Sequence, residues 1–398
     1  MGLSSTELLA RLVAFDTTSH RSNLPLIEWV ANYLSDLGVR PHLFHNADCS
    51  KANLFATVGP SEEGGVCLHG HTDVVPVEGQ PWQTDPFLLT ERDGLLFGRG
   101  TSDMKAWLSC SLAAIPSYRA RQLQTAIHVA LSYDEEIGCL GAPSLIAAFG
   151  VSIPKPRIAL IGEPSSMAPI IAHKGLLALD TTIKGRAAHS SLVHLGVSAV
   201  SAAAEMAVEL HRIGREWSVL SGPPGMHPSG PTVSVGKMCG GVARNVIPGE
   251  ARLSWEIRFR AVDDPDLLLK DASARIDARL RKSFKDCFGV LNVETREASR
   301  TPAFDSGAGG IAERLAWHLG AEGEAHGVPY GAEAGQYAAA GVATVICGPG
   351  SIEQAHQPNE FVSISQVAAC DRFLARLGEW ASGRSSDWLA RAPTMSSV

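Results

Sequence analysis

A histidine and an aspartate two residues apart, His71 and Asp73, follow the apolar segment Gly65–Leu68. Neutral imidazole is a common ligand of zinc and of its neighbours among the divalent metals. A nearby carboxylate can accept the other ring N–H of such a ligand and thereby fix its tautomer and orientation. The spacing therefore predicts His71 as a metal ligand and Asp73 as the residue that orients it. Taken alone, the pair is more typical of a histidine at a strand end, so this hypothesis depends on the rest of the chain.

Further ionisable residues follow other segments that are predicted to be buried strands. Residues 126–131, 157–161 and 342–347 are short apolar runs of this kind. In an open parallel sheet, the carboxyl ends of the strands share one edge, where binding sites form. The ionisable residues expected at this edge are His71, Asp134, Glu135, Glu136, Glu163 and His356, together with Asp103 on a glycine-rich loop before a predicted helix at 106–118.

So many carboxylates in one crevice would raise one another's pKa unless cations neutralised them. Two divalent ions about 3.5–4 Å apart would do so, and they would also lower the pKa of a bound water. The short side chain of Asp103 could bridge them. Adjacent glutamates in an extended segment point in different directions, so one of Glu135 and Glu136 can bind metal while the other acts as a general base. Each residue has an ordinary alternative, such as a solvated loop, a turn or a helix N-cap. Their coincidence favours a metal centre.

The predicted elements that must position these residues follow two different sequence patterns. Predicted helices alternate with buried strands in residues 1–176 and again in 298–398, which indicates an α/β domain with a mostly parallel sheet. Between them, in 177–297, strands alternate apolar and polar residues with period two, most clearly in 252–260. This pattern predicts an inserted α+β domain whose strands are covered by helices on one face. Residues 393–398 are expected to form a loose tail.

The composition of the chain argues against several classes of function. The net charge is −7 and the basic residues are scattered, which argues against a nucleic-acid partner. No apolar run approaches the roughly 18 residues that a membrane-spanning helix needs, and the N-terminus lacks a secretory pattern. The eight cysteines include no C-x-x-C pair and several lie in apolar runs, so the reducing cytoplasm is the expected compartment.

Several runs, in order along almost the whole chain, resemble the M20 metallopeptidase and deacylase family, most closely its acetylornithine deacetylase branch. They are Gly70-His71-Thr-Asp73-Val-Val-Pro76, Gly98-Arg-Gly-Thr-Ser-Asp103-Met-Lys105, Asp134-Glu135-Glu136, Gly162-Glu163-Pro-Ser165, Ala172-His-Lys-Gly175, Ala188-His189-Ser-Ser191, Arg244-Asn245-Val-Ile-Pro248 and Gly348-Pro-Gly-Ser351 to Ala355-His356-Gln-Pro-Asn-Glu360.

The resemblance implies a ligand set. His71 and Glu163 would hold one zinc ion, Glu136 and His356 the other, and Asp103 would bridge the two. Cobalt or manganese would also suit these donors. The resemblance further implies a cis peptide bond after Asp103.

The resemblance also implies the remaining catalytic roles. Glu135 would be the base that activates water, and the reaction would be metal-assisted hydrolysis of an amide. The inserted region would be a ferredoxin-like lid and dimerisation domain. Its His189 would approach the active site, commonly that of the partner protomer in a homodimer, and stabilise the oxyanion. Without the resemblance, His189 is a polar turn residue.

The implied substrate is a small N-acyl-L-amino acid. Arg258 would hold its α-carboxylate with Asn245 nearby, although Arg258 could also lie on a solvated sheet face. The run containing Lys174 favours N2-acetyl-L-ornithine, hydrolysed to L-ornithine and acetate in arginine biosynthesis. Glu333 would meet the cationic ornithine side chain or lie on the surface. Glu256-Ile-Arg258-Phe259 departs from the family's usual Asp-Ile-Arg-Pro.

Other functions stay open at this stage. Within the family, the alternatives are a succinyl-diaminopimelate desuccinylase and another aminoacylase or dipeptidase. A non-catalytic relative that binds acyl-amino acids would lack a ligand or the base, and none is missing from this sequence. A dinucleotide-binding oxidoreductase would need G-x-G-x-x-G between its first strand and helix, which Gly98-Arg-Gly100 does not supply.

Overall fold

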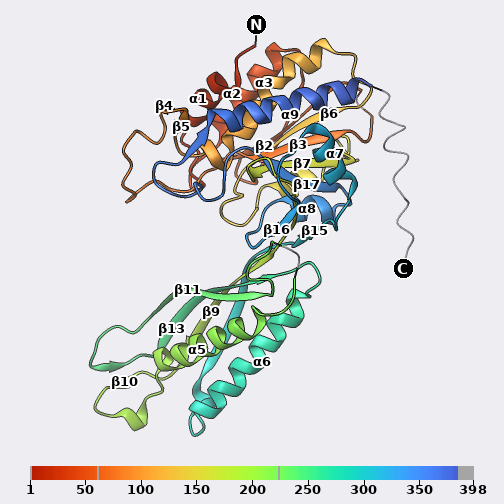
Figure 1. Ribbon diagram of the computed structural model, residues 1–398. Helices are drawn as coiled ribbons and strands as arrows, with labels where there is room; N and C mark the ends of the chain where they lie inside the picture. The colour runs from red at the N-terminus through yellow and green to blue at the C-terminus, as the bar shows by residue number, and fades with distance from the viewer. Residues whose placement is uncertain (1, 61, 223–224, 384–398) are drawn as a thin grey trace. The chain divides into compact units, whose positions relative to one another are not determined.

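The computed structural model describes residues 2–60, 62–222 and 225–383 (Figure 1). The chain divides into two compact units. The first comprises the chain up to Ile171, Ser306–His326 and the chain from Ala332, and the second comprises Ala172–Asp305 and Gly327–Gly331. The insertion predicted at 177–297 falls within the main segment of the second unit. The tail expected at 393–398 lies outside the described residues.

A mixed sheet forms the centre of the first unit. Its order is β1-β2-β6-β3-β7-β17-β8, with parallel pairing from β6 to β17 and antiparallel pairing of β1, β2 and β8. The parallel strands are thus neighbours, and their carboxyl ends share one edge. The strands are β1 (Pro41–His45), β2 (Ala52–Val58), β3 (Val66–His71), β6 (Ile127–Ser132), β7 (Ile158–Pro164), β8 (Ile170–His173) and β17 (Ala343–Gly348).

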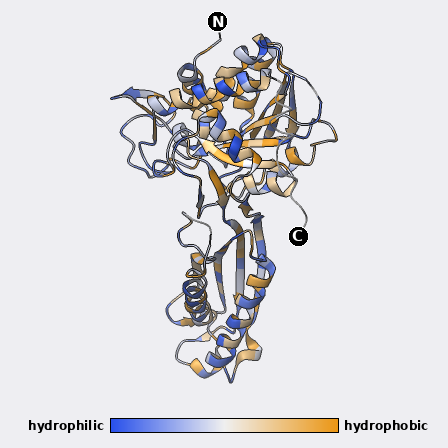
Figure 2. Cartoon of the chain, turned by 45° about the vertical axis from the view of Figure 1, so that its right-hand side comes forward, coloured by the Kyte–Doolittle hydropathy of each residue, from blue (hydrophilic) through white to orange (hydrophobic). Residues whose placement is uncertain are grey.

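Both faces of this sheet are buried, which explains why its strands read as continuous apolar runs. Leu54, Leu68 and Leu160 belong to one core that also contains residues of α1, α3 and α9. On the other face, Phe149 packs against Phe55 and also against Tyr337 of α8. Figure 2 shows the hydrophobic central strands. The helices of this unit are α1 (Ser5–Val13), α2 (Leu24–Asp36), α3 (Ala106–Ala120), α4 (Ala142–Ile146), α7 (Ile311–Leu319), α8 (Ala334–Ala339) and α9 (Ile364–Ser382).

A small three-stranded sheet, with order β18-β5-β4, also belongs to the first unit. It places residues 361–363 beside the segment that leads into the glycine-rich loop, because β18 pairs with β5. Its strands are β4 (Thr90–Arg92), β5 (Leu95–Phe97) and β18 (Phe361–Ser363).

The second unit contains an antiparallel sheet of order β11-β13-β9-β14, covered by helices α5 and α6. In β13, the alternate residues Leu253, Trp255, Ile257 and Phe259 are buried in the core of this unit, as their period-two spacing predicts. The elements are β9 (Gly175–Lys184), β10 (Ala188–His189), α5 (Ala199–Trp217), β11 (Thr232–Gly240), β12 (Val246–Ile247), β13 (Glu250–Phe259), α6 (Pro265–Ser283), β14 (Asn292–Thr301), β15 (Phe304–Asp305) and β16 (His326–Val328).

The helices that the structure describes include none that combines the length and the apolar character needed to cross a membrane.

Candidate metal centre

The ionisable residues of the first unit gather where its parallel strands end. His71 is the last residue of β3, and Glu163 is the penultimate residue of β7. Glu135 and Glu136 follow β6, which pairs with β3 in parallel, and His356 lies beyond β17. The sheet topology therefore brings these four chain segments to one edge, as the sequence predicts.

The side chains meet in a continuous series around Asp103. Nε2 of His71 lies 3.0 Å from Oδ1 of Asp103 and 3.9 Å from Oε1 of Glu163. The other carboxylate oxygen of Asp103, Oδ2, lies 3.3 Å from Nε2 of His356, which is 2.9 Å from Oε2 of Glu136. Asp103 thus directs one oxygen toward each histidine.

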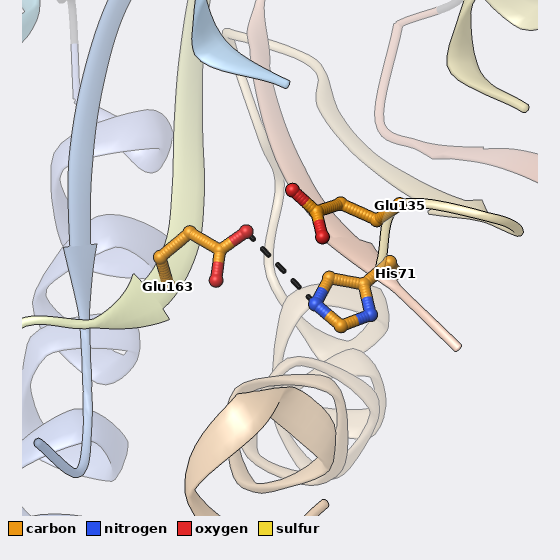
Figure 3. A group of neighbouring side chains, drawn as sticks. All are labelled: His71, Glu135 and Glu163. Atoms are coloured by element: carbon orange, nitrogen blue, oxygen red, sulfur yellow. Dashed lines mark ion pairs between the residues drawn. The ribbon is translucent and has the colours of Figure 1, made fainter. Parts of the chain in front are cut away.

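These separations suit ligands of metal ions. Atoms bound to one tetrahedral zinc ion at about 2.0–2.2 Å lie about 3.3–3.6 Å apart. The ligand atoms of His71, Asp103 and Glu136 all lie within 4.8 Å of one another, and so do those of His71, Glu135 and Glu163. Figure 3 shows the carboxylates of Glu135 and Glu163 pointing toward the His71 imidazole. The donor set fits two adjacent ions that share Asp103.

The electrostatics of the cluster also favour cations. Burial and the Asp103 charge raise the pKa of Glu136 to about 7. Burial, together with neighbouring carboxylates, raises the pKa of Glu135 and of Glu163 well above the ordinary value. Hydrogen bonds with Asp103 and Glu136 raise the pKa of His356 to about 10. Bound divalent ions would supply the positive charge that these carboxylates need in order to ionise.

The sequence predicts that the Asp73 carboxylate orients His71, but the structure places the backbone carbonyl of Asp73 closer to the imidazole. Nδ1 of His71 lies 2.9 Å from the backbone carbonyl oxygen of Asp73 but 3.6 Å from its carboxylate, so the carbonyl is the nearer acceptor. The Asp73 carboxylate accepts hydrogen bonds from the Ser19 hydroxyl at 2.7 Å and from the backbone N–H groups of Glu135 and Glu136 at 3.2 and 3.3 Å. Asp73 therefore also holds the loop that carries both glutamates.

The peptide bond after Asp103 has the conformation that the resemblance implies. The Asp103–Met104 peptide bond is cis. Asp103 itself is almost fully buried, at 6% exposure, in the turn that leads from the glycine-rich loop into α3.

Of the five remaining predicted site residues, four lie in the second unit, and Glu333 lies in the first. His189 in β10 is exposed and contacts the Ser191 hydroxyl, and Asn245 lies close to it because the N–H of Ser190 donates to the Asn245 carbonyl. Nε of Arg258 donates to Glu256 at 2.8 Å. Their roles toward a substrate stay predictions.

Lys174 is buried in the second unit, and its Nζ donates to the Gly230 carbonyl at 2.6 Å. Burial and the positive charges of Arg258 and Arg260 lower the pKa of Lys174 to about 8. The structure thus places Lys174 near Arg258, but inside the unit.

Glu333 is fully buried in the first unit, so the surface position considered for it is wrong. Its Oε2 is bonded to Nε2 of His69 and accepts from the Ser132 hydroxyl at 2.8 Å. His69 also contacts the hydroxyl of Tyr337 at 2.8 Å. Sequence reasoning missed this network, although His69 lies two residues before His71.

The sequence of the chain is similar to those of known peptidases and deacetylases. A model of peptidase family M20/M25/M40 matches residues 67–379. The chain belongs to peptidase family M20. The acetylornithine deacetylase of Myxococcus xanthus is 33% identical over 384 residues, covering 92% of this chain and 95% of that protein. That of Pasteurella multocida is 32% identical over 388 residues, covering 96% and 99%.

Solved structures show the M20 fold. An M20 metallo-carboxypeptidase from Sulfolobus solfataricus has a TM-score of 0.75 at 15% identity, covering 95% of this chain and 99% of that one. A dinuclear metal-binding M20 peptidase from Bacillus subtilis has a TM-score of 0.62 at 16% identity, covering 94% and 97%. The predicted family and α/β fold class are confirmed, and this M20 member is a metal-dependent amide hydrolase.

Proposed function

We propose that this M20 protein is a dimetal deacetylase that hydrolyses N2-acetyl-L-ornithine to L-ornithine and acetate, a step of arginine biosynthesis. The observation that carries the proposal is the series of ligand atoms from Glu163 through His71, Asp103 and His356 to Glu136. The acetylornithine deacetylases similar to this chain over more than nine-tenths of its length support the choice of substrate.

The five ligands divide between two ion positions. Position 1 would be held by His71, Glu163 and Asp103, and position 2 by Glu136, His356 and Asp103. Bound divalent ions would lower the pKa of a water and polarise the acyl carbonyl of the substrate. Zinc is the ion we propose, and cobalt and manganese suit the same donors.

Glu135 would move the proton of the reaction. Its carboxylate points toward the His71 imidazole (Figure 3), and the Cys139 thiol donates to it at 3.4 Å. The carboxylate can therefore take a proton from the attacking water and return it to the leaving amine as the C–N bond breaks. The product amine and acetate together contain the atoms of the water that is consumed.

The second unit would supply the substrate contacts. We propose that Arg258, with Asn245 nearby, binds the α-carboxylate and that His189 stabilises the oxyanion, from the partner protomer of a homodimer. Lys174 would add positive charge to this site, because it lies near enough to Arg258 for the Arg258 charge to lower the pKa of Lys174. We do not extend the proposal to Glu333, because its carboxylate is buried against His69 and Ser132.

The compartment follows from the chemistry of the cysteines. All eight are free, and five of them are buried. Buried thiols without disulfides suit a reducing environment, and we propose the cytoplasm.

A panel of amides tests the proposed substrate. The purified protein, loaded with zinc or cobalt, is assayed for release of free amine from N2-acetyl-L-ornithine, N-succinyl-diaminopimelate, other N-acetyl amino acids and dipeptides. We expect the highest kcat/KM for N2-acetyl-L-ornithine. A higher value for the succinylated substrate or a dipeptide would show that the protein is a hydrolase with a different substrate. Binding without turnover would favour a non-catalytic relative.

A further inference from the structure

One buried carboxylate, that of Glu360, accepts four N–H groups from the loop that carries Asp103. Its Oε1 accepts the backbone N–H groups of Ser102 at 2.8 Å and Asp103 at 3.0 Å. Its Oε2 accepts the backbone N–H of Gly100 at 3.0 Å and Nη1 of Arg99 at 2.6 Å. Glu360 is buried, with 1% of its surface exposed. Both of its carboxylate oxygens accept hydrogen bonds from this loop, and one of the donors is the backbone N–H of Asp103.

Arg99 extends the same contacts to the segment that carries His356. Its Nη1 also donates to the carbonyl of Gln357 at 3.3 Å, and its Nη2 donates to Oε1 of Gln80 at 2.6 Å. Nε2 of Gln80 in turn donates to the carbonyl of His356 at 3.1 Å. Glu360 lies four residues after His356, so Arg99, Glu360 and Gln80 join the Asp103 loop to the His356 segment. We call these three residues the clamp.

The two ion positions depend on the clamp to different degrees. His71 and Glu163 lie within β3 and β7, where the hydrogen bonds of the sheet hold the backbone. His356 lies in a turn, with a positive φ of 64°, and its side chain is 51% exposed. Position 1 therefore has one ligand on a clamped loop, whereas position 2 has two, Asp103 and His356.

We propose that Glu360 is a positioning residue that sets the affinity of position 2, by holding Asp103 and His356 at the separation that one ion requires. The inference rests on the proposed dimetal function. Residues that support metal ligands typically change affinity by about 10–100-fold when they are replaced. Loss of the clamp would shift two ligands of position 2, Asp103 and His356, but only one ligand of position 1. The affinity of position 2 for its ion should therefore fall more than that of position 1.

The test is a titration of metal-free protein with Co²⁺, followed by calorimetry and visible absorption. Glu360→Gln keeps the size of the side chain but turns one acceptor oxygen into an NH2 group that faces N–H donors. We expect one of the two binding steps of the wild type to weaken by about 10–100-fold while the other changes less. His356→Ala, which removes a ligand of position 2, identifies the step that should be affected.

A matched control separates this role from the general cost of altering a buried carboxylate. Glu313 is also buried, and it accepts N–H groups from Gly309 and Trp317, away from the metal centre. Glu313→Gln should leave both Co²⁺ steps unchanged. Equal weakening of both steps in Glu360→Gln, unchanged steps, or the same loss in Glu313→Gln would each overturn the proposal.

A second variant keeps the inference testable if Glu360→Gln does not fold. Gln80 is only partly buried, so Gln80→Ala should fold, and it removes one link between Arg99 and His356. We expect the same step to weaken by a smaller factor, and an unchanged titration would contradict the clamp. A wild-type protein that binds no pair of ions would instead refute the proposed function itself.

Discussion

Glu135 and Glu136 are adjacent in the chain, yet their contacts assign them different chemistry. Oε2 of Glu136 lies 2.9 Å from Nε2 of His356, which makes it a ligand candidate. Glu135 accepts a weak bond from the Cys139 thiol and points toward His71. Asp73 receives the backbone N–H groups of both residues and so fixes the loop from which they diverge.

Replacing Glu135 with Gln should therefore separate catalysis from metal binding. The amide keeps the shape of the side chain but cannot take a proton, so we expect kcat to fall by about 10²–10⁴-fold. Both metal ions should stay bound, as measured by metal analysis of the dialysed protein. Glu136→Gln is the matched control and should instead lose metal. Near-normal kcat in Glu135→Gln would remove Glu135 from the role of base.

Lys174 should make the stability of the protein depend on pH. Its pKa is lowered to about 8 in the folded protein, from 10.5, so between these values the unfolded chain binds the proton and the folded protein does not. The free energy of unfolding should therefore rise with pH across this window, by at most about 1.4 kcal/mol per pH unit. Urea unfolding at pH 8 and pH 10, measured as the difference between wild type and Lys174→Met, isolates the effect. A difference that is flat or falls with pH would contradict it.

At the level of elements, β3 carries two histidines, His69 and His71, that point to the same face of the sheet and contact different groups of residues. His71 faces the ligand cluster, whereas His69 packs against Tyr337 of α8 and is bonded to Glu333. The pairing of β3 with β6 and β7 fixes both histidines at once. The Glu333 network thus joins the start of α8 to the strand that carries His71.

Glu333→Ala should destabilise the first unit. The change leaves His69 and Ser132 without their buried acceptor, which we expect to lower the free energy of unfolding by about 3 kcal/mol or more. Glu324→Ala, at an exposed glutamate, is the control and should have little effect. Chemical denaturation of the metal-free proteins measures both. Equal stability of the two variants would show that the Glu333 network contributes nothing.

Sequence patterns predicted the elements that have strong periodicity. The apolar run of β3 and the alternation of β13 both correspond to the observed strands. Strand β11 (Thr232–Gly240) was missed, because it lies at a sheet edge, most of its residues are exposed, and its pairing is irregular between Val235 and Lys237. An edge strand buries too little on either face to show a clear period.

The sequence predicts the site residues that lie at the ends of parallel strands. It does not predict their hydrogen-bond partners from distant loops. The ligand group could be inferred from the parallel topology. The contacts of Asp73 with Ser19, of Glu333 with His69, and of Glu360 with the Asp103 loop join residues that are at least 54 positions apart. No spacing rule encodes such pairs, because they depend on how loops fold against one another.

We expect the whole molecule to be a homodimer. We expect light scattering of the purified protein to give twice the 42.1 kDa of one chain. In that assembly, His189 of one protomer would serve the site of the other, so mixing His189→Ala with Glu135→Gln protomers should restore part of the activity. A monomeric mass in an active preparation would contradict the assigned origin of His189.

We propose that two ions bind between strand ends of the first unit, with Asp103 between them. Anomalous diffraction at the zinc edge, from crystals grown with zinc, tests it directly. We expect two peaks about 3.5–4 Å apart, one beside His71 and Glu163 and the other beside Glu136 and His356. A single peak at this edge of the sheet, or zinc bound elsewhere while these residues hold none, would contradict it.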